Sequence, residues 1–228
     1  MAAVPAFARY EVDVRRPNAA RIHDFYLGGA HNYAADRAFA KQAVRIDPEL
    51  PLVTRAHRLF LKHAVRHCWA AGVRQFLDLG SGIPTCGATH QTLPDSRVVY
   101  VDSDPVTVAF ARGLLRGEPR TCAVEADLRR PEQVLRHPGV MSHLDLREPY
   151  AVLMVDVLRY VDDATGPGRV VRRYRHALPA GGFLVVSHPA PVEQLMEGLS
   201  IEAPCVVPGA YAGIGRKPGR IQTSGGAS

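Results

Sequence analysis

The chain has 228 residues, of which 46% are hydrophobic and 22% are charged, and its formal net charge is +6 at pH 7. This length supports one well-filled hydrophobic core, and no apolar run approaches the roughly 18 residues that a membrane span requires. The first residues include acids and lack the continuous apolar stretch of a secretory signal, so we expect a cytoplasmic protein without membrane contact.

The spacing of cysteine and histidine argues against a metal-binding protein, and the charge pattern argues against a nucleic-acid-binding protein. The cysteines are scattered without a C-x-x-C pair, which is not the spacing of a zinc site. His63 and His67 are four residues apart, but no third ligand accompanies them, so we expect no metal. Basic and acidic residues are interspersed, which makes a nucleic-acid partner a weak expectation.

Helical patterns fill the first third of the chain. Asn18 is a suitable N-cap for the first helix. Apolar spacing predicts that Ala38 faces inward from the second helix and Leu59 from the third. We expect residues 1–72 to form a helical cap within the same domain as the rest of the chain. The predicted helices cover residues 18–28, 33–46 and 52–71.

From residue 73 onward, strand and helix patterns alternate. This alternation predicts an α/β fold with a doubly wound, mainly parallel sheet and an N-terminal helical extension. We expect one core over residues 73–218, followed by a Gly/Ser-rich, disordered tail over residues 219–228. The predicted strands are 73–79, 97–101, 121–126, 150–155 and 182–187, and the helices between them are 85–93, 105–115, 131–135 and 169–178.

The loop after the first strand is the expected ligand site, because ligands of such sheets bind beyond the carboxyl ends of the strands. It reads FLDLGSGIPT over residues 76–85. A dinucleotide loop needs a third glycine, where this loop has Thr85, and Pro84 removes an N–H that would bind a pyrophosphate. Asp78 would also repel a phosphate. These features disfavour NAD and FAD and favour S-adenosylmethionine (SAM), whose sulfonium and ammonium groups are cationic.

Two further carboxylates follow the next two strands. Asp102, with Asp104 nearby, ends the second strand, where it can accept both hydroxyls of a ribose. Asp127 follows the third strand, where it can accept an adenine amino group. Each acid alone is more often a helix cap or a turn residue. Together with Asp78 they occupy successive strand ends, so we expect them to face one crevice and bind a cofactor.

Several motifs resemble known sequences. D-x-G-x-G, VDSDP, ADLR and ALPAGGFLVVSH together are similar to the class I SAM-dependent methyltransferases. More narrowly, RIHDFYLGGAHNYAADRA, RAHRLFLKHAVR, QFLDLGSGIPT and VVYVDSDPV resemble the actinobacterial S-adenosyl methyltransferase family, formerly a domain of unknown function. The resemblance extends over residues 15–190 and YAGIGRKP near the end. It implies a Rossmann-like fold and SAM as cofactor, but no particular acceptor.

The resemblance also implies roles for individual residues. The N-terminal block is expected to fold over the cofactor as a lid that also contacts substrate. The lid residues would be Tyr26, Asn32, Tyr33 and Asp36. The cofactor-binding residues would be Asp78, Gly80, Ser81, Gly82, Pro84, Thr85, Asp102, Ser103, Asp127 and Leu128. Apart from the resemblance, Arg58 is a candidate for binding an anionic acceptor, although such an arginine more often pairs with acids at the surface.

Catalytic residues have a weaker signal. His188, at the end of the fifth strand, is a candidate general base, although a strand-end histidine is more often a satisfied structural residue. Tyr160 and Arg159 follow the fourth strand, where such enzymes often face the acceptor. Arg159 stands where relatives more often have histidine, and His57 where asparagine is usual. The segment after His188 is short for the family, which predicts a reduced substrate wall.

These observations lead us to expect a SAM-dependent methyltransferase acting on a small-molecule acceptor. Such catalysis can rest on positioning and desolvation, which suits a sequence without an evident catalytic dyad. The alternative is a SAM-binding protein with weak or no catalysis, a sensor or structural partner, as the shortened segment suggests. A third hypothesis is an RNA methyltransferase, motivated by the excess of arginine. The sequence does not indicate an oligomeric state.

Overall fold

The computed structural model describes residues 13–162 and 164–219. Within this part of the chain, seven strands form one sheet in the order β3-β2-β1-β4-β5-β7-β6. The strands are β1 (Gln75–Leu79), β2 (Arg97–Asp102), β3 (Thr121–Glu125), β4 (Ala151–Met154), β5 (Phe183–His188), β6 (Ser200–Val207) and β7 (Ala210–Arg216). From residue 220 on, the predicted disordered tail lies outside the described residues.

The sheet is parallel from β1 to β5 and antiparallel at one edge. β1 pairs with both β2 and β4, β2 with β3, and β4 with β5, all in parallel. β7 then runs antiparallel to β5, and β6 antiparallel to β7. This arrangement confirms the predicted α/β fold with a mainly parallel sheet. It also brings the carboxyl ends of β1 to β4 to one edge, which is where a ligand site is expected.

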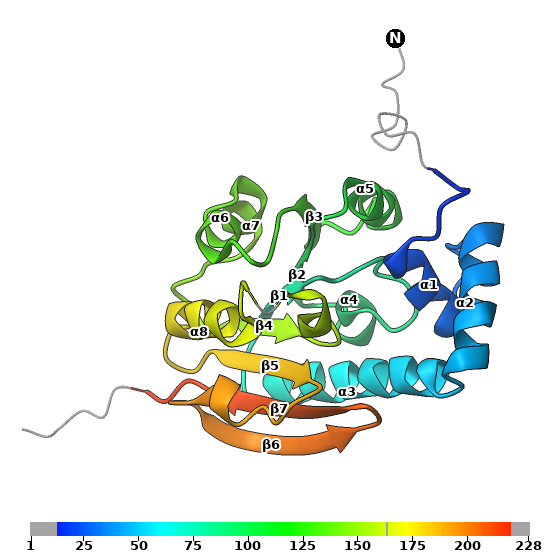
Figure 1. The fold of residues 1–228 in the computed structure, drawn as a ribbon. Coiled ribbons are helices and arrows are strands. Elements are labelled where there is room, and N and C mark those ends of the chain that lie inside the picture. Colours follow the sequence, from blue (N-terminus) through cyan, green and yellow to red (C-terminus); the bar gives the residue numbers. More distant parts are fainter. Residues whose placement is uncertain (1–12, 163, 220–228) are drawn as a thin grey trace, which may run out of the picture.

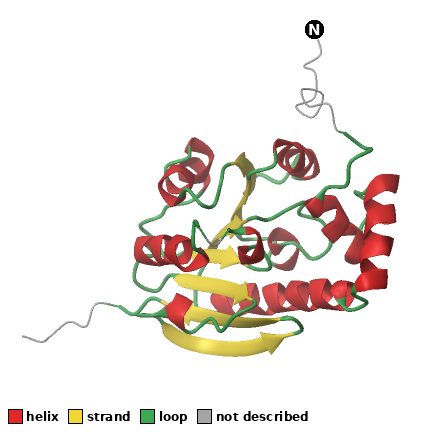
Figure 2. Cartoon of the chain, viewed as in Figure 1, coloured by secondary structure: helices red, strands yellow, loops and turns green. Residues whose placement is uncertain are grey.

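Helices cover both faces of the sheet, on the left and right of the view in Figures 1 and 2. Residues of β1 and β4 are fully buried, as expected for central strands that carry helices on both sides. One face packs against α3 (Leu50–Ala70), α4 (Thr89–Thr92) and α5 (Pro105–Leu114). The other packs against α6 (Pro131–Leu135), α7 (Pro138–His143) and α8 (Pro167–Ala177).

The first two helices form a block at one end of α3. They are α1 (Ala19–Tyr26) and α2 (Ala34–Ile46), and α1 lies between α2 and the sheet (Figure 1). Asn18 caps α1 as predicted, since its side-chain oxygen accepts a hydrogen bond from the backbone N–H of Arg21 at 3.2 Å. This position places the start of α1 beside the carboxyl edge of the sheet.

On two of these helices, some of the residues predicted to face inward are exposed. Ala38 is exposed, whereas the carboxylate of Asp36 is buried because it pairs with the guanidinium of Arg21 at 2.7 Å. On α3, Phe60, Ala64 and Cys68 are buried as their spacing predicts, whereas Leu59 is exposed at the margin of this face. Apolar periodicity alone cannot identify a helix face that is held by a buried ion pair.

The segment after the glycine loop also differs from the prediction. The helix expected over residues 85–93 is reduced to α4, because Gly87 adopts a φ of 71° and interrupts the helix before Thr89. Pro84 therefore does not lie in a first helical turn. Beyond β5, the short segment still forms the antiparallel pair β6–β7 at the sheet edge.

Candidate functional site

A cavity of about 370 Å³ opens at the carboxyl edge of the sheet. The segments that follow four neighbouring strands contribute to its walls, and α1 and α3 close it from the other side. Asp78 lies near the end of β1 and Gly80 directly after it, Asp102 ends β2, Asp127 follows β3, and Asp156 follows β4. The three carboxylates predicted to share one crevice therefore line one cavity.

Asp78 and Arg58 form an incompletely satisfied pair of opposite charges in this cavity. Asp78 is 8% exposed, and its hydrogen bond from the hydroxyl of Thr89 is long at 3.4 Å. Burial raises the pKa of Asp78 to about 6, although the charge of Arg58 opposes the rise. Burial also lowers the pKa of Arg58, against the effect of Asp78. The guanidinium of Arg58 makes no hydrogen bond or ion pair with the described residues. Both the carboxylate of Asp78 and this guanidinium therefore remain available to bind a ligand.

The glycines of the loop are required by their backbone conformation and surroundings. Gly80 and Gly82 adopt φ values of 64° and 62°, which favour glycine. A Cβ on Gly80 would lie 2.1 Å from Cγ2 of Val157, in the segment after β4. The loop can therefore pass close to the cavity only without side chains at these positions.

Asp102 fixes the same loop to the end of β2. Its two carboxylate oxygens accept hydrogen bonds at 3.0 Å from the backbone N–H groups of Gly82 and Asp104. Each oxygen retains a further lone pair that can face the cavity. The carboxylate of Asp104 in turn accepts a hydrogen bond at 2.8 Å from the side-chain amide of Asn18. This bond ties the start of α1 to the rim of the cavity.

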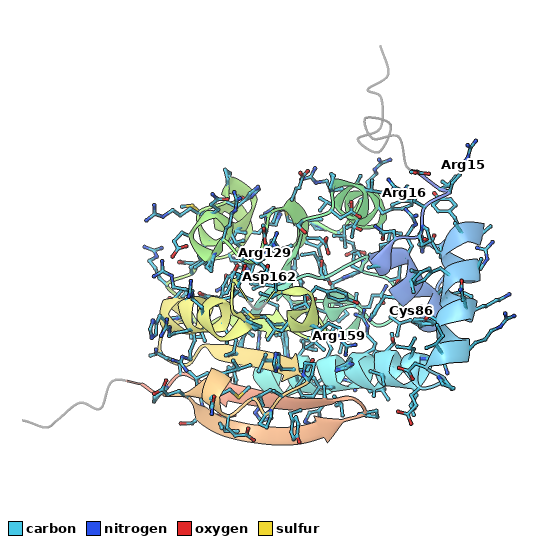
Figure 3. All side chains as sticks on the ribbon, viewed as in Figure 1. Arg15, Arg16, Cys86, Arg129, Arg159 and Asp162 are labelled. Carbon is cyan, nitrogen blue, oxygen red and sulfur yellow. The ribbon has the colours of Figure 1, made fainter. Side chains whose placement is uncertain are left out.

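Asp127 is more fully paired than the sequence suggested. Its carboxylate accepts hydrogen bonds from Nε and Nη2 of Arg129 at 3.0 and 2.8 Å, which lower its pKa. Arg129 also lies 3.5 Å from the carboxylate of Asp162, and Figure 3 shows these two labelled residues side by side. An adenine amino group at Asp127 would therefore compete with Arg129.

The segment after β4 supplies a further acid, Asp156, that the sequence analysis did not identify. It adopts a φ of 60°, unusual for a residue with a side chain, and its N–H donates to the hydroxyl of Ser187 at 2.8 Å. Its carboxylate lies 2.6 Å from Arg159, 3.6 Å from Nδ1 of His57 and 3.9 Å from Nε2 of His23. The sequence signal was an acid directly after a buried strand, as for the other three carboxylates.

The sequence matches the profile of the S-adenosyl methyltransferase family over residues 5–197. The chain belongs to this family. It is therefore a SAM-dependent methyltransferase, as the resemblance of its motifs implied.

Solved structures give the same assignment of fold. A protein from Thermobifida fusca YX, described as an inferred methyltransferase, is 33% identical, with a TM-score of 0.82 over 91% of this chain and 97% of that one. A DUF574 family protein from Streptomyces avermitilis is 29% identical, with a TM-score of 0.80 over 91% and 100%. The N-methyltransferase NodS from Bradyrhizobium japonicum WM9 shares the fold alone, at 15% identity and a TM-score of 0.52 over 70% and 97%. No curated protein matches the sequence.

Ten of the residues singled out from the sequence of this methyltransferase line the main cavity. They are Arg58, Asp78, Gly80, Ser81, Gly82, Asp102, Ser103, Asp127, Leu128 and Tyr160. Of the predicted lid or substrate residues only Arg58 is among those that line the cavity, and α1 and the residue before it contribute residues that the sequence analysis did not select for this role: Asn18, Ala19, Ala20 and His23.

The other residues singled out lie outside the main cavity. They are Tyr26, Asn32, Tyr33, Asp36, Pro84, Thr85, Arg159 and His188. The structure shows what most of them hold together. The hydroxyl of Tyr26 donates to the carbonyl of Ala40, and the amide of Asn32 and the hydroxyl of Thr85 donate to the carboxylate of Asp24. Thr85 thus links the glycine loop to the N-terminal block.

His188 and Arg159 lie next to His57 and Asp156, outside the main cavity, where the side chains leave no room for a water-sized molecule. Figure 3 shows the labelled Arg159 in the region between β4 and α3. Within residues 13–162 and 164–219, no group of three or more His, Cys, Asp or Glu side chains is placed to hold a metal ion. No helix in that part of the chain is long and apolar enough to cross a membrane.

Proposed function

We propose that this methyltransferase acts on a small molecule whose nucleophile enters the main cavity beside the segment that follows β4. The observation that carries this proposal is the size of the cavity, about 370 Å³, with α1 and α3 facing the sheet edge. This volume is near the lower end of the range of roughly 300–1,000 Å³ for small-molecule sites. A bound cofactor takes much of it, so little room is left for the acceptor.

The cavity residues fit SAM, which supplies an activated methyl group on a cationic sulfur. Asp102 would accept hydrogen bonds from the ribose hydroxyls through the lone pairs that the backbone leaves free. Asp78 would bind the ammonium of the amino-acid end, and Arg58 its carboxylate. This assignment supports a role for Arg58 toward the cofactor, and it explains why two partly buried, opposite charges are left poorly paired in the ligand-free protein.

The side chains beside the adenine end complete the proposed cofactor site. Leu128 and Val157 both line the cavity, close to Gly80. We expect them to contact the faces of the adenine ring. Because Asp127 is paired with Arg129, we expect its contribution to adenine binding to be smaller than that of Asp102 to ribose binding.

The protein's own contribution to catalysis is then positioning and exclusion of water. Residues from α1 and α3 face the strand ends across the cavity, so both reactants would be held in one orientation with little solvent between them. The exposed ring of Tyr160 stands at the cavity wall, where it can contact the acceptor.

Incubation of the protein with methyl-labelled SAM and a cell extract tests the proposal. We expect label to enter small metabolites, and this transfer should disappear with the Asp102→Ala variant. Label in RNA would instead support an RNA methyltransferase. SAM binding without any transfer would support a sensor or structural protein, and either result would contradict a small-molecule acceptor.

A further inference from the structure

His57 is a buried histidine whose ring nitrogens form no hydrogen bond to another side chain of the described residues. It lies on α3 and is 1% exposed. Neither Nδ1 nor Nε2 has a side-chain hydrogen-bond partner among the described residues, and the backbone of Val53, one helical turn earlier on α3, interacts with the ring. Buried polar groups in folded proteins are nearly always paired, because an unpaired one is destabilising. An exception that lines a cavity therefore points to a partner that arrives with a ligand.

The groups around His57 come from three separate parts of the fold. Asp156 follows β4 and approaches Nδ1 of His57 to 3.6 Å, while Arg159 lies 2.6 Å from the same carboxylate oxygen. His23 on α1 faces the other oxygen of Asp156 at 3.9 Å. Arg58, the next residue on α3, is the further cation in the cavity wall. The site thus joins two imidazoles, a carboxylate and two guanidinium groups.

The order of strands places this cluster at the opposite end of the cavity from the ribose site. Along the sheet edge, the strand ends run from Asp127 and Asp102 through Gly80 to Asp156. A cofactor whose ribose lies at Asp102 and whose amino-acid end lies at Asp78 has Asp156 and His57 beyond it. The conformation of Asp156 is strained for a residue with a side chain, and such strain is concentrated at functional sites.

The surroundings of His57 keep its ring neutral. Burial lowers the pKa of His57, and the charge of Arg159 acts in the same direction, while the charge of Asp156 and a backbone hydrogen bond to Val53 oppose the shift. Because Nδ1 is the atom nearest Asp156, the tautomer with its proton on Nδ1 leaves the lone pair of Nε2 free. A neutral imidazole with a free lone pair can accept a proton at neutral pH.

We propose that His57 is the general base of the methyl transfer and that Asp156 positions it, so the acceptor is a protic group, a hydroxyl or an amine. The proposal rests on the proposed function. As the acceptor's oxygen or nitrogen forms its bond to the methyl carbon, the carbon–sulfur bond breaks and its electron pair stays on sulfur. The acceptor's proton passes to Nε2 of His57 and then to solvent.

Binding of sinefungin, a SAM analogue with an amine in place of the methyl-bearing sulfonium, tests this assignment without a known acceptor. Its ammonium would donate hydrogen bonds to His57 and Asp156, which the demethylated product S-adenosylhomocysteine (SAH) cannot do. In calorimetric titrations, we expect His57→Phe and Asp156→Asn each to weaken sinefungin binding about tenfold or more, as for charge-assisted hydrogen bonds. SAH affinity should change much less.

His63→Gln is the matched control, since His63 is an exposed histidine on the same helix. It should change neither affinity. If His57→Phe weakened both ligands equally, or neither, the proposal would be wrong, while SAH binding by the wild type would leave the proposed function standing. If the wild type bound neither ligand, the proposed function would fall and this inference with it.

A second measurement separates positioning by Asp156 from a merely structural role. Titration of the histidine resonances by NMR gives the pKa of His57 directly. We expect a value below that of an ordinary histidine, and a further decrease in Asp156→Asn, because the carboxylate favours the protonated ring. An unchanged value in Asp156→Asn would remove Asp156 from the proposal.

Discussion

At the level of single residues, Asp78 is a carboxylate that the fold keeps in an unfavourable environment. Burial raises its pKa from 3.8 to about 6, so the folded protein holds this proton more tightly than the unfolded chain does. The stability associated with this residue is therefore lost as the pH rises through that interval. A binding site for an ammonium group would account for a charge that costs stability in the absence of ligand.

Asp78→Asn should reveal this cost through its pH dependence. Relative to the wild type, the variant's free energy of unfolding without ligand should rise by roughly 2–3 kcal/mol between pH 4 and pH 7. Its affinity for SAH should fall at pH 7, where the wild-type carboxylate is charged. Urea denaturation at both pH values measures the first effect. A difference in stability that does not vary with pH would contradict the environment described for Asp78.

Asp102 offers a test of the ribose site. Asp102→Ala should weaken SAH binding by roughly 1–3 kcal/mol, because it removes charge-assisted hydrogen bonds. Asp95→Ala is the control, since Asp95 is an exposed acid shortly before β2. Calorimetry at one salt concentration compares both variants. Equal affinities for wild type and Asp102→Ala would exclude Asp102 from the site.

The close contact at Gly80 can be tested by comparison with Gly117, which also has a positive φ but has open space where a Cβ would lie. Gly80→Ala combines a positive φ with a contact of 2.1 Å to Val157, whereas a Cβ on Gly117, at φ 92°, meets no atom within 4 Å. Both variants should lose roughly 1 kcal/mol from backbone strain. Only Gly80→Ala should lose more and also bind SAH weakly. Thermal unfolding measures the loss of stability, and calorimetry measures SAH affinity. Equal stability and equal SAH affinity of the two variants would contradict this prediction.

At the level of elements, the N-terminal helices hold the cavity wall through polar contacts. The carboxylate of Asp36 accepts hydrogen bonds from Arg21 and from the backbone N–H groups of Asn18 and Tyr33. Asn18 then reaches Asp104 at the start of α5. Asp36, predicted as a lid residue, thus acts at a distance, because it fixes the start of α1, where Asn18 and its neighbours line the cavity.

Asp36→Ala should loosen this block. It leaves the guanidinium of Arg21 buried without its partner, and breaking such a pair costs roughly 3–5 kcal/mol. Hydrogen exchange should show lower protection in α1, and SAH affinity should fall. Asp47→Ala, at the exposed end of α2, is the control. Unchanged protection of α1 in Asp36→Ala would show that Asp36 does not hold the block.

The sequence predicted most of the helices and strands, but it did not predict which side chains from different helices and strands contact one another. Apolar runs and Gly-x-Gly with three strand-end acids were enough to predict the parallel strands and the cavity at their carboxyl ends. Asp156 and His23 were not found, because their meeting with His57 depends on how α1 and α3 dock against the sheet. The predicted inner face of α2 was wrong for the same reason, since the buried ion pair of Asp36 with Arg21 outweighed apolar spacing.

At the level of the whole molecule, the strand order places four acids that are far apart in the sequence side by side along the carboxyl edge of the sheet. Asp127, Asp102, Asp78 and Asp156 come from neighbouring strands, while α1 and α3 cover them. In the proposed binding mode, one end of this row holds the nucleoside, and the other holds the amino-acid end of the cofactor and the acceptor. The antiparallel pair β6–β7 extends the far edge of the sheet beside β5.

A crystal structure of the protein with SAH tests the central claim most directly, because it shows where each end of the ligand lies. We predict ribose hydroxyls on the carboxylate of Asp102, with the amino-acid end between Asp78 and Arg58 and the sulfur facing the side of His57 and Asp156. SAH bound in the reverse orientation, or outside the cavity at the carboxyl edge of the sheet, would contradict this account.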